Sequence, residues 1–149
     1  MAFTNVTVNE INKVNEGMTA ATYADMATAL ASNGESSATI GACFEMKERD
    51  DKYLLLFVNT DSNSQSFTIK ASNALQGVND YTCTLAAGKF TAMSIDSGRF
   101  KWVSANDGYV DLAKTIPHNI STSGFTEKGK VFVTATDAKV KMAVFKLPN

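Results

Sequence analysis

The feature that most constrains the fold is a regular alternation of short β-rich runs with turn clusters from residue 38 to the end of the chain. About eight to ten apolar or β-branched runs are separated by clusters of Gly, Asn, Asp and Ser, the spacing typical of sandwiches and barrels. No long helix is indicated after residue 31. We therefore expect an all-β fold, an antiparallel β-sandwich of jelly-roll or immunoglobulin-like type.

The run YLLLFV at residues 53–58 is apolar at every position. A strand that is apolar on both faces is typical of a buried position, so we expect residues 52–60 to form a central strand covered on both sides. Residues 139–147 alternate instead, which places Val140 and Met142 inward. The other expected strands cover residues 39–47, 66–71, 82–86, 89–95, 99–103, 109–113, 119–121 and 130–136.

The length of 149 residues fits one domain with a substantial core. We expect residues 1–37 to form an N-terminal arm or extension packed on a sandwich domain of residues 38–149. Residues 9–17 allow one or two helical turns capped by Asn9, and residues 18–37 fit a helix and extended structure almost equally well.

Composition and charge argue against several classes of function. The formal net charge is −1 and the 14 basic residues are scattered, so no direct contact with nucleic acid is expected. No apolar run is long enough to span a membrane, and no signal peptide is recognised, so we expect synthesis in a cytoplasm and no membrane partner. Cys43 and Cys83 are expected to be small buried side chains without a disulfide.

Residues that carry chemistry are sparse. His118 is the only histidine and follows Pro117, without a recognisable partner that would orient it as a general base. The Asp50–Asp51 pair and the Asp61–Asn63 turn offer oxygen ligands for calcium, but such residues also favour turns, which is the interpretation we prefer. We expect no enzyme, no metal and no cofactor, while an enzyme on a sandwich remains a third hypothesis.

Residues 91–104, TAMSIDSGRFKWVS, contain the only tryptophan. The cluster Asp96-Ser97-Gly98 predicts a hairpin turn between strands 89–95 and 99–103, with Gly98 at positive φ and the Asp96 carboxylate accepting an amide two residues on. A Gly98→Val substitution would then be costly.

Partner contacts are expected from this stretch and from the turn region that follows it. The candidates are Arg99, Lys101, Trp102 and Tyr109. For Trp102 three interpretations stay open: a core residue, an interface residue, or half of a sugar-binding platform shared with Tyr109.

The order of several short motifs resembles that of bacteriophage capsid decoration (cement) proteins. These motifs are VNT at 58–60, SFTIKA at 66–71, QGVND at 76–80, LAAGKF at 85–90, IDSGRFK at 95–101 and VKMAVFKL at 140–147. The resemblance spans residues 55–147, about two thirds of the chain. It implies a β-sandwich on the virion surface that binds the major capsid protein and reinforces the shell, as a monomer or a trimer, with no catalytic residues.

Two other roles stay open beside decoration. A head-fibre, neck or tail component is close to it in kind. A carbohydrate-binding sandwich module differs, because it needs an exposed aromatic platform.

Overall fold

The structure is a computed structural model that describes residues 4–11, 24–28, 39–103 and 129–148. These residues are built mainly from strands, with two short helical turns, η1 (Asp50–Lys52) and α1 (Ser97–Phe100). The strands are β1 (Thr4–Asn5), β2 (Val8–Glu10), β3 (Ala24–Thr28), β4 (Thr39–Glu45), β5 (Tyr53–Asn59), β6 (Gln65–Ile69), β7 (Tyr81–Leu85), β8 (Phe90–Met93), β9 (Lys130–Ala135) and β10 (Val140–Lys146).

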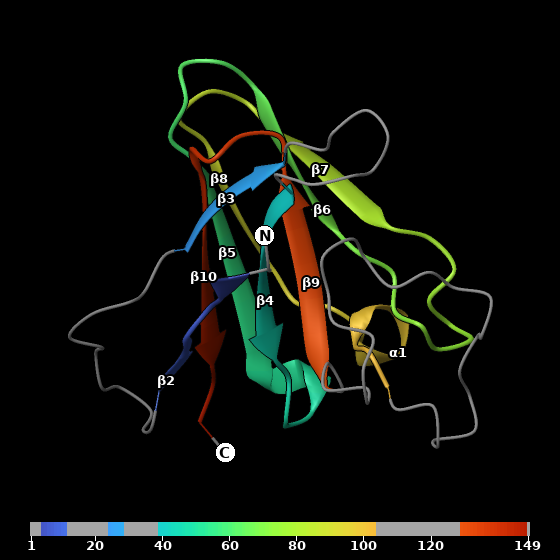
Figure 1. The fold of residues 1–149 in the computed structure, drawn as a ribbon. Helices are drawn as coiled ribbons and strands as arrows, with labels where there is room; N and C mark the ends of the chain where they lie inside the picture. Colours follow the sequence, from blue (N-terminus) through green and yellow to red (C-terminus); the bar gives the residue numbers. More distant parts are fainter. Residues whose placement is uncertain (1–3, 12–23, 29–38, 104–128, 149) are drawn as a thin grey trace.

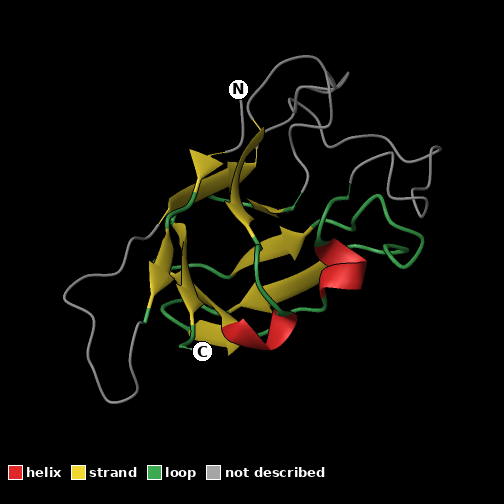
Figure 2. Cartoon of the chain, turned by 90° about the horizontal axis from the view of Figure 1, so that it is seen from below, coloured by secondary structure: helices red, strands yellow, loops and turns green. Residues whose placement is uncertain are grey.

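The strands form two packed sheets that are joined along one side. The first sheet has the order β7-β6-β9-β4, and the second has the order β10-β5-β8. β3 joins them, because its first residues pair with β10 and its last residues pair with β4. Figure 1 shows β3 crossing between the sheets, and Figure 2 shows the strands in two layers with the helical turns beside them. The expected all-β sandwich is therefore confirmed as a fold class.

The main core lies between the sheets and follows from the two-residue periodicity of strands. Alternate side chains point to the same face, so each strand contributes every second residue to the interior. Phe57 of β5 and Phe67 of β6 stack at the centre, with ring centroids 3.7 Å apart and planes 8° from parallel. Val140 and Met142 of β10 are fully buried, as their alternation predicts. Apolar burial of this kind is the principal stabilising contribution to such a fold.

Strand β5 occupies the central position that its sequence predicts, with β10 on one side and β8 on the other. Its core face is buried, but its opposite face is only partly covered. Leu54 is 37% exposed, and Leu56 and Val58 are half-buried. The expectation that both faces are covered was therefore wrong for the outer face, because periodicity alone does not reveal what lies above a sheet.

Three strands come from the described part of residues 1–37. β1 pairs with β4 and β2 pairs with β10, both in parallel, unlike the antiparallel pairing expected of the sandwich. Asn9, expected to cap a helix, lies in β2, and its amide Nδ2 donates to the carbonyl of Val144 at 3.0 Å. Residues 24–28, for which a helix and extended structure were expected almost equally, form the strand β3. Residues 12–23 and 29–38, and the strands expected at 109–113 and 119–121, lie outside the described residues.

Candidate functional site

Residues 96–103 form a helical turn and an extended segment, not the second arm of a hairpin. β8 pairs with β5, while the chain after α1 runs beside the start of β9. There the amide of Trp102 donates to the carbonyl of Lys130 at 2.9 Å, and the carbonyl of Trp102 accepts the amide of Gly129 at 2.7 Å. The expected hairpin was wrong because Ile95 and Phe100 are both drawn into the main core, which closes the intervening residues into a turn of helix.

One expectation for this turn is confirmed, the hydrogen bond of Asp96, and one was wrong, the positive φ of Gly98. The Asp96 carboxylate accepts from Gly98 N at 2.7 Å, as predicted, and so caps α1. Gly98, however, is not among the described glycines with positive φ, which are Gly88 and Gly129. The expected cost of Gly98→Val therefore loses its stated cause, and a side chain there would instead meet the exposed Gln76 side chain.

Trp102 is a buried residue, as the core interpretation predicts. It is 4% exposed and packs edge-on against Phe132, with centroids 5.8 Å apart and planes at 90°. Together with Cys43 these rings form a second apolar cluster on the outer face of the first sheet. A buried indole cannot serve as the exposed half of a sugar-binding platform.

The other candidate contact residues differ in their exposure to solvent. Arg99 is exposed, with its guanidinium carbon 5.0 Å from the centroid of the Phe100 ring, and Lys101 is half-buried. Within the described residues neither side chain makes an ion pair. Tyr109 and His118 lie outside the described residues.

A loop that was not among the candidate contacts from the sequence lies beside α1. It runs from residue 71 to residue 80 between β6 and β7, and two of its polar residues, Ser72 and Asn73, are buried. The backbone amide of Ser72 donates to Arg99 O at 2.7 Å, and Asn73 exchanges two hydrogen bonds of 2.9 Å with the backbone of Val103. This loop and residues 96–103, which we call the α1 segment, therefore form one continuous surface.

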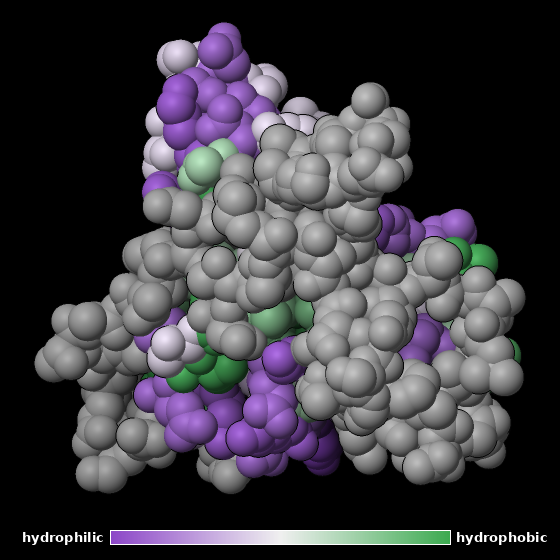
Figure 3. All heavy atoms as spheres, in the orientation of Figure 1, coloured by the Kyte–Doolittle hydropathy of each residue, from purple (hydrophilic) through white to green (hydrophobic). Residues whose placement is uncertain are grey.

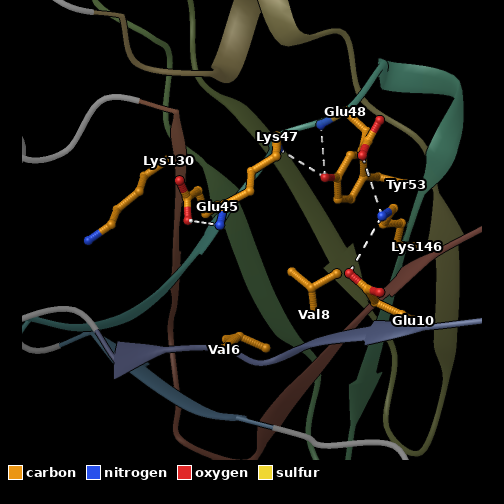
Figure 4. A pocket seen from close by; sticks show the side chains of 9 residues that line it. All are labelled: Val6, Val8, Glu10, Glu45, Lys47, Glu48, Tyr53, Lys130 and Lys146. Atoms are coloured by element: carbon orange, nitrogen blue, oxygen red, sulfur yellow. Dashed lines mark hydrogen bonds and ion pairs between the residues drawn. The ribbon is translucent and has the colours of Figure 1, made fainter.

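A cavity of about 360 Å³ opens at the seam between the N-terminal strands and the turn after β4. Its walls hold the apolar residues Val6, Val8 and Tyr53, the acids Glu10, Glu45 and Glu48, and the bases Lys47, Lys130 and Lys146. Figure 4 shows these side chains, and Figure 3 shows a small apolar area bordered by hydrophilic atoms on the same side of the molecule.

The charges of the cavity largely satisfy one another. Lys146 Nζ lies 3.5 Å from both Glu10 and Glu48, while the Tyr53 hydroxyl accepts backbone amides of Lys47 at 2.9 Å and Glu48 at 3.2 Å. Partial burial opposes the charged form of Lys146, but the two glutamates outweigh it and raise its pKa. Lys146 therefore stays protonated at neutral pH. Its ion pairs link β10 to Glu10 in β2 and to Glu48 in the turn after β4.

The second pair of calcium candidates, Asp61 and Asn63, lies in the turn between β5 and β6. The Asp61 carboxylate accepts from Gln65 Nε2 at 2.7 Å, from Lys139 Nζ at 3.2 Å and from the amide of Ser62 at 2.6 Å. These bonds, led by Gln65 and Lys139, lower the pKa of Asp61 to about 2. They occupy its oxygens, and the described residues contain no metal-binding cluster of His, Cys, Asp and Glu. The turn interpretation accounts for both residues.

Both cysteines are free thiols, with Cys43 buried and Cys83 half-buried. In the described ranges, no helix has both the length and the apolar character needed to cross a membrane.

Comparisons with family models, with curated proteins and with solved structures gave no match. They therefore leave the resemblance to capsid decoration proteins as an expectation. Two features remain as candidate sites, the charged cavity and the surface formed by α1 with the adjoining loop.

Proposed function

We propose that the chain is a virion structural protein that binds the outer surface of the major capsid protein shell and stabilises it. The observation that carries this proposal is that Arg99 and Lys101 make no ion pair within the described residues and lie on an α1 segment anchored at both ends. Cations without a local partner suit a rim that meets an acidic surface, since complementary charge speeds encounter and selects the partner.

The anchoring of this segment supports a binding role. The carboxylate of Asp50 accepts the amide of Ser97 at 2.9 Å, and Trp102 is bonded to the start of β9. A surface held in one conformation loses less entropy on binding than a free loop does. The cavity is a weaker candidate, because its glutamates and lysines already pair with each other.

A head-fibre, neck or tail component is the nearest alternative, and capsid binding separates it from decoration. The carbohydrate-binding alternative has lost support, because Trp102 is buried. Self-association as a trimer, or binding as a monomer, stays a prediction that light scattering on the free chain would check.

The proposal is tested by mixing the purified chain with undecorated capsid shells of the phage that encodes it and sedimenting the mixture. We expect the chain to pellet with the shells, and the double variant Arg99→Glu/Lys101→Glu to bind about tenfold more weakly at low salt. The control is Lys89→Glu, which reverses one charge where the α1 variant reverses two. The backbone carbonyl of Lys89 accepts the amide of Asn59 at the end of β5 that lies far from α1. Reversing the charge of Lys89 should therefore leave capsid binding unchanged.

Failure of the unaltered chain to pellet with the shells at any salt concentration would reject the decoration role. If Lys89→Glu weakens binding to the shells as much as Arg99→Glu/Lys101→Glu does, the effect is one of overall charge and α1 makes no contact.

A further inference from the structure

We infer that the loop of residues 71–80 is the apolar centre of the contact surface, and that it inserts Leu75 and Val78 into an apolar pocket with acidic borders on a protein partner. The inference rests on the proposed function, in which that partner is the major capsid protein. It assigns a binding role to two residues that were not among the candidate contacts from the sequence, although Val78 lies in the QGVND motif of the resemblance.

The base of the loop is fixed by two buried polar residues. Ser72 is fully buried, donates its amide to Arg99 O at 2.7 Å, and places its hydroxyl 3.2 Å from Gly98 O. Asn73 is 3% exposed and bonds twice to Val103. Buried polar groups with satisfied hydrogen bonds define one conformation, because breaking any of these bonds would leave a group unpaired in the interior.

The two ends of the loop are also tied together. The Asp80 carboxylate accepts the amide of Ala71 at 2.7 Å and pairs with the ammonium of Lys70. Inside the loop, Gly77 lies so close to the backbone of Ser72 that a Cβ atom would collide with it. The loop is therefore closed at its ends and tightly turned inside.

The tip of this closed loop presents two apolar side chains to solvent. Leu75 is 64% exposed and Val78 is 72% exposed, on either side of Gly77. Figure 1 shows the loop beside α1, and Figure 3 shows apolar atoms reaching the surface along the same edge of the molecule. Apolar side chains held on a pre-formed loop gain from burial in a partner without a large cost in ordering.

The charges around the tip decide what kind of partner fits. Arg99 and Lys101 lie on the segment to which the loop is bonded, and within the described residues neither is neutralised by a carboxylate. Lys70, in contrast, is paired with Asp80. An apolar centre with a cationic border is complementary to an apolar pocket bordered by Asp or Glu, the usual arrangement of an interface core and its polar rim.

The test compares Leu75→Ser/Val78→Ser with Phe90→Ser in sedimentation with undecorated capsid shells. Phe90 is the matched control, because it is 70% exposed but lies opposite Val58 near the far end of β5. We expect the loop variant to bind at least about tenfold more weakly and the Phe90 variant to bind normally, since a few central apolar residues dominate an interface. Unchanged Trp102 fluorescence would confirm that each variant is folded.

The possible outcomes separate the two proposals. If the unaltered chain binds the shells and the loop variant binds equally well, the inference is wrong while the decoration role stands. If the unaltered chain does not bind the shells, both are wrong. A parallel assay with phosphatidylserine vesicles covers the other partner class, because loop-dependent binding to vesicles and not to shells would replace the protein partner by a membrane surface.

Discussion

The role assigned to Trp102 depends on its surroundings in the fold, which its neighbours in the sequence do not reveal. In the sequence it lies between Lys101 and Val103, close to Arg99, which suggests a contact site. In the fold its ring covers the outer face of β4 and β9, where it meets Phe132 and Cys43. Its Nε1 finds no hydrogen-bond acceptor in the part of the chain that the structure describes, so its contacts there are apolar.

The first prediction concerns this residue. Trp102→Ala should lower the free energy of unfolding by about 3–5 kcal/mol, because it leaves a large cavity beside Phe132. Trp102→Phe should cost less than about 2 kcal/mol, since it keeps an aromatic ring and removes a buried donor that has no acceptor among the described residues. Urea unfolding followed by circular dichroism measures both values. Equal costs for the two variants would contradict this account.

At the scale of elements, the turn between β5 and β6 holds one end of the sandwich together. Asn59 is fully buried, and its amide Nδ2 lies within 3.1 Å of the carbonyl oxygens of Leu85 and Ala86 at the end of β7. Its Oδ1 accepts the amide of Asp61, whose carboxylate reaches Lys139 in the turn before β10. Three chain reversals therefore depend on one pair of polar side chains.

The second prediction concerns the pH dependence of this turn. The pKa of Asp61 is about 2 in the folded chain against an ordinary value of 3.8, so folding is favoured by its ionised form. That stabilisation is complete above pH 3.8 and is lost as the pH falls towards 2. Asp61→Asn should therefore be less stable than the natural chain at pH 5, and the difference should shrink by pH 2.

Denaturant unfolding at several pH values measures this effect. Gln65→Ala should show an intermediate effect, because Gln65 supplies the largest part of the shift while the carboxylate remains. A stability difference between Asp61→Asn and the natural chain that stays constant from pH 5 to pH 2 would show that Asp61 does not carry the effect.

For the whole molecule, the N-terminal strands complete the seam between the two sheets. β1 lies along β4, β2 lies along β10, and β3 pairs with both. Val6 is buried in the main core, and Lys146 links Glu10 of β2 to Glu48 in the turn after β4. The start of the chain therefore covers strand edges that would otherwise be unpaired.

The third prediction follows from this arrangement. Removing residues 1–10 should lower the melting temperature and the free energy of unfolding by at least about 2 kcal/mol, through loss of the buried Val6 and of strand hydrogen bonds. It should also promote self-association, because the edges of β4 and β10 become free. Removing residues 1–3, which leaves both strands, is the control.

Calorimetry and analytical ultracentrifugation measure the two effects. A chain without residues 1–10 that melts and sediments like the control would show that β1 and β2 add nothing to the fold.

Local patterns were sufficient for the strands of the main core and insufficient elsewhere. Alternation correctly placed Val140 and Met142 inward, and the run at residues 53–58 correctly predicted a central strand. The hairpin at Asp96–Gly98 failed because its turn chemistry also suits a helix cap. The loop of residues 71–80 was not a candidate contact in the sequence, because only the buried state of Ser72 and Asn73 distinguishes it from an ordinary polar loop.

By itself, then, the sequence determined the fold class, the core faces of the strands and the positions of most turns, since these depend on neighbouring residues and on a two-residue period. The tertiary structure decided which strands are partners, that Trp102 is buried, and that the loop with Leu75 and Val78 is bonded at its base to the segment with Arg99 and Lys101. These properties depend on contacts between residues far apart in the chain, and no local pattern encodes such contacts.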